Sequence, residues 1–76
     1  MSRYFFDLVC PNRVELDFRG SEFPSVERAY RQAEIIALDL AVGIADNWFG
    51  WTVEVRDQGG QRLFHVPILN CEQVAA

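Results

Sequence analysis

One stretch at the centre of the chain decides its fold: PSVERAYRQAEIIALDLAVGIADN, residues 24–47. Pro24 ends any strand before it, and Ser25 suits the N-cap because its hydroxyl can accept a hydrogen bond from a backbone N–H of the first turn. Gly43 weakens the last turns, and Asp46-Asn47 marks the end of the segment. The pattern therefore predicts one long helix over residues 24–47.

The predicted helix carries two apolar stripes at helical spacing. The stripe predicted to face the core comprises Val26, Ala29, Ala33, Ile36, Ala37, Leu40 and Ile44. Ile35, Leu38 and Val42 fall on the opposite side, among charged residues. Either a partner packs on this second stripe, or its members are scattered surface aliphatics, which soluble proteins commonly carry. Trp48 and Phe49 would enlarge the patch if exposed, and would otherwise cap the end of the core.

Before the helix, residues 3–18 alternate in polarity, which is typical of a β-hairpin. A turn at Pro11-Asn12 separates the two predicted strands. The side chains predicted to face the helix are Tyr4, Phe6 and Leu8 in the first strand and Val14, Leu16 and Phe18 in the second. In this arrangement Leu8 faces Val14 across the pair of strands.

After the helix, residues 51–68 predict a second hairpin. Gly59-Gly60 suits a two-residue turn because glycine adopts positive φ without steric cost. The resulting register pairs Val55 with Phe64, Val53 with Val66 and Trp51 with Ile68, so that each inward residue faces another. Pro67 indicates that the last strand lies at a sheet edge, since proline cannot donate to a neighbouring strand.

These elements predict an α+β fold of the type ββαββ. We expect a four-stranded antiparallel sheet in the order 2-1-3-4, with one helix packed on one face. The alternative order 2-1-4-3 would require a parallel pair between the first and last strands. Residues 1–70 form the single predicted domain, and residues 71–76 form a frayed C-terminal tail.

Composition excludes several classes of function. The 76 residues carry a net charge of −4, whereas nucleic-acid binding needs a basic face, so we expect no nucleic-acid partner. The longest apolar stretch, residues 35–45, is interrupted by Asp39 and too short to span a bilayer, so we expect no membrane partner. No signal peptide is recognisable, because Asp7 breaks the first apolar run. We expect a cytoplasmic protein without a cofactor.

Two cysteines, Cys10 and Cys71, are present. In the predicted sheet they lie at the same end with one strand between them, about 10 Å apart, which is too far for a disulfide. They lack the spacing of a metal site. We expect structural thiols.

Two pairs of polar residues are candidate sites. If Leu8 faces Val14, Asp7 faces Glu15, and a hard cation would relieve the repulsion between these carboxylates. The simpler interpretation is a solvated edge or a different register. Glu54 and His65 face each other in the second hairpin and could form an acid–base pair, but a surface ion pair is the favoured interpretation, because no serine, cysteine or lysine nucleophile lies on the same strands and an open sheet face does not exclude water.

Several segments resemble a family of short bacterial domains of unknown function, domain of unknown function 6894. The resemblance rests on Arg3-Tyr4-Phe5-Phe6-Asp7, on Gly20-Ser21-Glu22-Phe23-Pro24-Ser25 with Ala29 and Ala33, on Glu54-Val55-Arg56-Asp57-Gln58-Gly59 and on Val66-Pro67. It implies the fold and a bacterial origin. Because the family has no assigned activity, the resemblance implies no catalytic residue.

The function predicted from the sequence is a non-enzymatic interaction module. It would self-associate, as a dimer for example, or bind a protein partner through Ile35, Leu38, Val42, Trp48 and Phe49. One alternative is a weak cation-binding or acid–base site on the acidic open face of the sheet. Another is an antitoxin-like domain that binds a partner, an analogy of layout alone.

Overall fold

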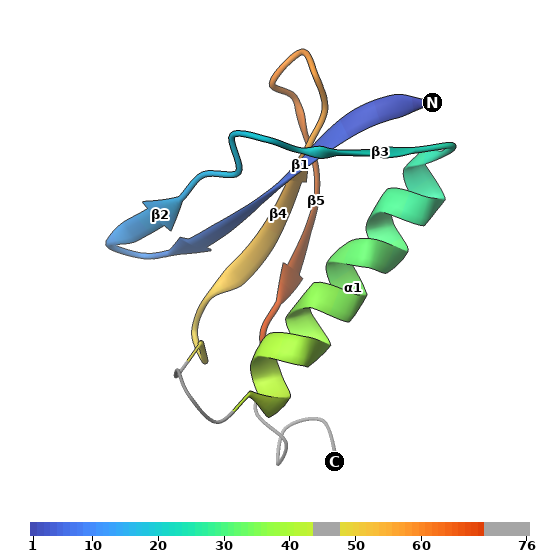
Figure 1. Ribbon diagram of the computed structural model, residues 1–76. Helices are drawn as coiled ribbons and strands as arrows, with labels where there is room; N and C mark the ends of the chain where they lie inside the picture. The colour runs from blue at the N-terminus through green and yellow to red at the C-terminus, as the bar shows by residue number, and fades with distance from the viewer. Residues whose placement is uncertain (44–47, 70–76) are drawn as a thin grey trace.

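The computed structural model describes residues 1–43 and 48–69, and shows one helix packed against an antiparallel sheet (Figure 1). Its elements are β1 (Ser2–Cys10), β2 (Arg13–Glu15), β3 (Ser21–Phe23), α1 (Val26–Val42), β4 (Thr52–Arg56) and β5 (Arg62–Pro67). The sheet order is β2-β1-β4-β5, and the short strand β3 also pairs with β1. The α+β fold and the order of the four predicted strands are confirmed, and β3 is an additional strand. The predicted tail, residues 71–76, lies outside the described residues.

Helix α1 begins as predicted but ends earlier. The Ser25 hydroxyl accepts a hydrogen bond from the Arg28 backbone N–H at 3.2 Å, which confirms the N-cap. The helix ends at Val42, because Gly43 adopts an extended conformation. Of the remaining predicted helix, residues 44–47 lie outside the described part of the chain, and with them Ile44 and Asp46-Asn47.

The core lies between α1 and the two strands beneath it, β4 and β5. Four alanines one turn apart form the buried face of the helix: Ala29, Ala33, Ala37 and Ala41. Their small side chains let the helix lie close to Val53 and Val55, which have no exposed surface. Val26, predicted to belong to the core stripe, is instead exposed in the first turn.

The register predicted for the first hairpin is wrong by one residue. Leu8 pairs with Glu15 and Val9 with Val14, because the two-residue turn at Pro11-Asn12 sets Cys10 directly opposite residue 13. A slip of one residue turns every side chain of a strand to the other face.

The same slip turns Val14 to the outer face, where it is exposed instead of buried. Leu16 and Phe18, which follow β2, are exposed as well, with Phe18 reaching 86%. Strand β2 also ends at Glu15, and it projects beyond the region that α1 covers (Figure 1). Apolar alternation over residues 14–18 therefore does not lead to full burial, because α1 packs mainly on β4 and β5.

The register of the second hairpin is confirmed. Val55 pairs with Phe64 and Val53 with Val66, and β5 lies at the sheet edge as Pro67 indicates. The predicted two-residue turn is wrong in detail: the Gly60 N–H donates to the Asp57 carbonyl at 3.0 Å, and φ is +85° at Gly60.

This turn holds one residue more than predicted. An irregularity in β5 compensates for it, since Arg56 pairs with Arg62 while Val55 pairs with Phe64. The residue in between, Leu63, packs with Phe64 against the core. The extra residue thus leaves the predicted inward pairs unchanged.

Candidate functional site

The outer face of the sheet holds a buried ion pair. Asp7, of which 5% is exposed, accepts a hydrogen bond from Arg56 Nε at 2.7 Å and another from the Asp17 backbone N–H at 2.9 Å. Arg56 Nη2 donates to the Asp17 carbonyl at 3.0 Å, and its guanidinium lies 4.5 Å from the centre of the Phe5 ring. The charge of Asp7 is therefore matched within the chain, and we call this set of residues the Asp7–Arg56 network.

Asp17 ties the loop after β2 to this network. Its carboxylate accepts hydrogen bonds from the backbone N–H groups of Phe6 at 3.1 Å, Arg19 at 3.1 Å and Gly20 at 3.0 Å. Burial by itself raises the pKa of the Asp17 carboxyl, but these hydrogen bonds and the positive charge of Arg56 outweigh it and lower the pKa. Asp17 is therefore held as a carboxylate that closes the loop over the sheet.

The predicted pair of Asp7 and Glu15 does not form. In the observed register Asp7 faces Glu54 on β4, whereas Glu15 faces Leu8 and lies 3.9 Å from an arginine of its own strand. No group of three or more histidine, cysteine or acidic side chains comes together among residues 1–43 and 48–69 in a way that could hold a metal ion.

Sequence reasoning missed the Asp7–Arg56 network. Phe5 pairs with Arg56, which makes Asp7 a diagonal neighbour of Arg56 on the same face. The predicted strand order already made β1 and β4 neighbours, so the missing information was their register. No pattern in the sequence indicated the contribution of Asp17, because this contribution depends on the path of a loop.

Glu54 and His65 face each other as predicted. The Glu54 carboxylate also forms an ion pair with Arg62, whose Nε lies 3.3 Å away, and the Arg62 side chain is mostly exposed. An ion pair with a mostly exposed arginine is typical of a protein surface, and no ion pair joins Glu54 to His65 among the described residues.

Cys10 carries a free thiol at the end of β1. Its sulfur lies 3.3 Å from the Asn12 side-chain oxygen, with which it makes a hydrogen bond across the turn. Cys71, which was predicted not to form a disulfide with Cys10, lies outside the described residues.

The second stripe of α1 is exposed along its whole length. The exposed fractions are 52% for Ile35, 57% for Leu38 and 58% for Val42. Phe49, after the helix, is exposed as well. Trp48 is only half-exposed and packs edge-on against Trp51, with ring centres 5.1 Å apart, so this predicted interface residue helps to close the end of the core.

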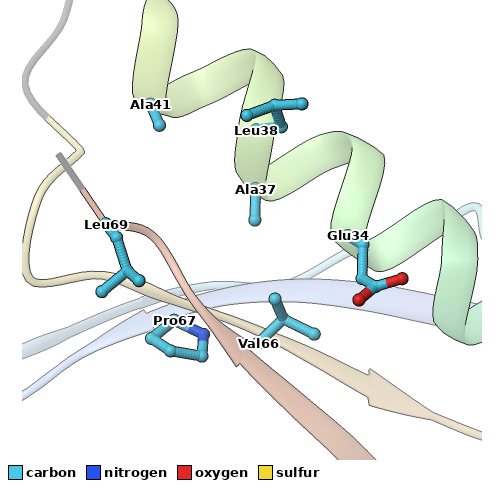
Figure 2. A pocket seen from close by; sticks show the side chains of 7 residues that line it. All are labelled: Glu34, Ala37, Leu38, Ala41, Val66, Pro67 and Leu69. Carbon is cyan, nitrogen blue, oxygen red and sulfur yellow. The ribbon is translucent and has the colours of Figure 1, made fainter. Parts of the chain in front are cut away.

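An apolar groove continues this stripe toward the sheet edge. It has a volume of about 250 Å³ and separates α1 from β5 (Figure 2). Its lining comprises Glu34, Ala37, Leu38 and Ala41 from the helix and Val66, Pro67 and Leu69 from β5 and the residues that follow. Figure 2 shows Leu38 at the helix rim of the groove and Leu69 and Pro67 on the opposite side.

A second hollow of about 280 Å³ lies nearer the N-terminus of the helix, and it is lined by Arg31, Glu34, Ile35 and Leu38. Glu34 and Leu38 line both hollows, so the stripe and the groove form one continuous surface. We call it the α1–β5 surface; its apolar members are Ile35, Leu38, Val42, Val66, Pro67 and Leu69.

Comparison with known protein families shows the family to which the chain belongs. The model of a protein family described as "Domain of unknown function (DUF6894)" matches residues 3–69. No curated protein and no solved structure shows significant similarity to the chain. Within the described residues, no helix is long and apolar enough to cross a membrane.

Proposed function

This chain belongs to the DUF6894 family, and we propose that it is a non-enzymatic interaction module that docks another protein, or a second copy of itself, on the α1–β5 surface. The observation that carries the proposal is the exposed row Ile35, Leu38 and Val42 on the side of α1 that faces away from its own core. A helix of a small monomeric domain normally presents charged and polar residues there.

The continuity of the α1–β5 surface supports the same proposal. Single exposed aliphatic side chains are common, but apolar groups that gather around a groove are typical of interaction sites. Here Leu38 joins the helical stripe to a groove whose other wall is Pro67 and Leu69, and Leu69 is itself exposed. A partner could therefore bury apolar side chains against both the helix and the sheet edge.

The test compares Leu38→Glu with Leu16→Glu, an equally drastic change at an exposed leucine far from α1. Tagged wild-type chain and both variants are used to capture proteins from a lysate of the source organism, and their oligomeric states are measured by light scattering. We expect a captured protein, or a dimer, that the wild type and Leu16→Glu share and that Leu38→Glu loses. A monomer with the same captured proteins for all three chains would contradict the proposal.

A further inference from the structure

We propose that the occupant of the α1–β5 surface is an amphipathic helix of another protein that carries lysine or arginine beside its apolar stripe. This inference rests on the proposed function and specifies the chemistry of the partner. It is argued from the shape of the surface and from the charges along its border.

The surface suits a helix better than an added strand. Ile35, Leu38 and Val42 follow one another at three- and four-residue intervals and extend over about 10 Å of the helix axis, which is the ridge that a second helix packs against. Strand addition would use the free edge of β5. Pro67 removes a backbone donor there, and the irregularity at residues 62–64 distorts the other end of the strand.

Acidic residues border the apolar stripe on both sides. At about 100° per residue, Glu34 and Asp39 lie roughly 70° to either side of the line through Ile35, Leu38 and Val42. Both are exposed, and neither forms an ion pair within the described part of the chain. Glu34 also lines the two apolar hollows, so a partner that fills them brings its own groups next to this carboxylate.

Basic residues stand only at the beginning of the outer face of the helix. Arg28 and Arg31 precede Ile35 in the sequence, and Arg31 lines the second hollow together with Glu34, whereas Glu34 and Asp39 flank the stripe from Ile35 to Val42. A partner helix that covers the stripe therefore meets negative charge along its flanks. Cationic flanks on the partner would complement that charge and set its orientation.

A second copy of the chain complements this surface poorly. If two α1 helices pair in opposite directions about Leu38, each Asp39 lies beside the Asp39 of the other copy. If they pair in the same direction, Glu34 of one copy faces Asp39 of the other. Each copy also carries a net charge of −4. Both arrangements oppose like charges, which favours a different, cationic partner.

The test is a selection from a displayed library of 18-residue helical peptides. Leucines occupy one stripe at three- and four-residue intervals, and each flanking position is either lysine or glutamate. The targets are the full wild-type chain, Leu38→Glu, and the double variant Glu34→Lys/Asp39→Lys, with circular dichroism to confirm that each is folded. Affinities of selected peptides are then measured by titration.

The wild type is expected to enrich peptides with lysine flanks, and the double variant is expected to prefer glutamate flanks. Two surface charge pairs correspond to a preference of roughly threefold to fivefold. Leu38→Glu should bind the selected peptides at least about tenfold more weakly. A further variant, Leu16→Glu, should bind them as the wild type does.

Each other outcome overturns a defined part of the argument. Peptides that depend on Leu38 but show no preference for lysine would overturn the cationic partner and leave the docking surface in place. A wild-type chain that forms a Leu38-dependent dimer would overturn the choice of a different partner in the same way. No enrichment, or binding that Leu38→Glu leaves unchanged, would overturn both the inference and the proposed function.

Discussion

The outer face of the sheet and the outer face of α1 both differ from what is expected of a solvent-facing surface. An open sheet face should be wet and polar, yet Asp7 is buried there beneath the loop that contains Asp17. The solvent-facing side of a helix should be polar, yet on α1 it exposes the apolar side chains of Ile35, Leu38 and Val42. The comparison shows that the chain closes its charged face by itself and leaves its apolar face uncovered.

The two faces also differ in how strongly the fold depends on them. The Asp7–Arg56 network joins β1, β4 and the loop after β2, elements that lie far apart in the sequence. The exposed members of the α1–β5 surface, such as Leu38 and Leu69, contribute little to the core, because much of their apolar side chains remains in contact with water. Substitutions in the Asp7–Arg56 network should therefore lower the free energy of unfolding, whereas substitutions of exposed residues on the α1–β5 surface should leave it nearly unchanged.

The largest effect is expected from Arg56→Met. This change leaves Asp7 buried without its cationic partner and removes the donor to the Asp17 carbonyl. Breaking a buried ion pair from one side typically costs several kcal/mol, so we expect the free energy of unfolding to fall by about 3 kcal/mol. Urea denaturation of the purified chain measures this loss.

Arg62→Met is the matched control for that experiment. The Arg62–Glu54 pair has similar chemistry, but the Arg62 side chain is mostly exposed, so the expected loss is under about 1 kcal/mol. Equal losses for the two variants would contradict the view that burial makes the Asp7–Arg56 network important.

Gly20→Ala should have the next largest effect. Gly20 holds φ at +72°, and an added Cβ would lie 2.9 Å from both Arg3 Cγ and Phe5 Cε1. The strained backbone and the crowding together predict a loss of about 2 to 3 kcal/mol in the free energy of unfolding.

Gly50→Ala separates these two causes. Gly50 has φ at +90°, but an added Cβ meets no atom of the described residues within 4 Å. We expect a loss of about 1 kcal/mol, which reflects the backbone alone. If chemical denaturation gives Gly20→Ala the same loss as Gly50→Ala, the loop does not lie as close to β1 as the structure has it.

A smaller effect should appear on acidification. Because the pKa of Asp17 is lowered in the folded chain, its ionisation stabilises the fold above the ordinary carboxyl value of 3.8, and this stabilisation disappears as pH falls through the lowered value. Denaturation midpoints measured at decreasing pH should fall more steeply for the wild type than for Asp17→Asn. Parallel curves would show that Asp17 does not contribute.

Leu38→Glu should have the smallest effect on stability. Leu38 is exposed and glutamate is a good helix former, so the free energy of unfolding should change by no more than about 0.5 kcal/mol. The adjacent variant Ala37→Glu, which places a carboxylate beneath the helix, should lose several kcal/mol. A large loss for Leu38→Glu in thermal denaturation would mean that the α1–β5 surface is part of the core.

Local patterns in the sequence predicted the helix, its buried side and its exposed stripe. Helical periodicity alone separates Leu38 from Ala37 by about 100° and from Ala33 by about 140° around the helix axis, because these angles depend only on the 3.6 residues per turn. The second hairpin was equally predictable, since inward pairing of Val53 and Val55 selects one register.

The first hairpin shows where such patterns fail. The alternation over residues 14–18 predicted buried side chains. Burial also requires an opposing surface, however, and α1 lies over β4 and β5 instead. The turn at Pro11-Asn12, and not the apolar pattern, set the register. The predicted cation site at Asp7 and Glu15 depended on that register and disappeared with it.

By itself, then, the sequence determined the elements that depend on neighbouring residues: the amphipathic helix with its N-cap, and the inward pairs of the second hairpin. Only the tertiary structure decided that Asp7 meets Arg56 and Asp17, and that Leu38 borders a groove beside Pro67. The physical reason is the distance along the chain between the residues that interact. Periodicity follows from bond geometry within a few residues, whereas a buried charge or an open groove depends on where distant segments meet.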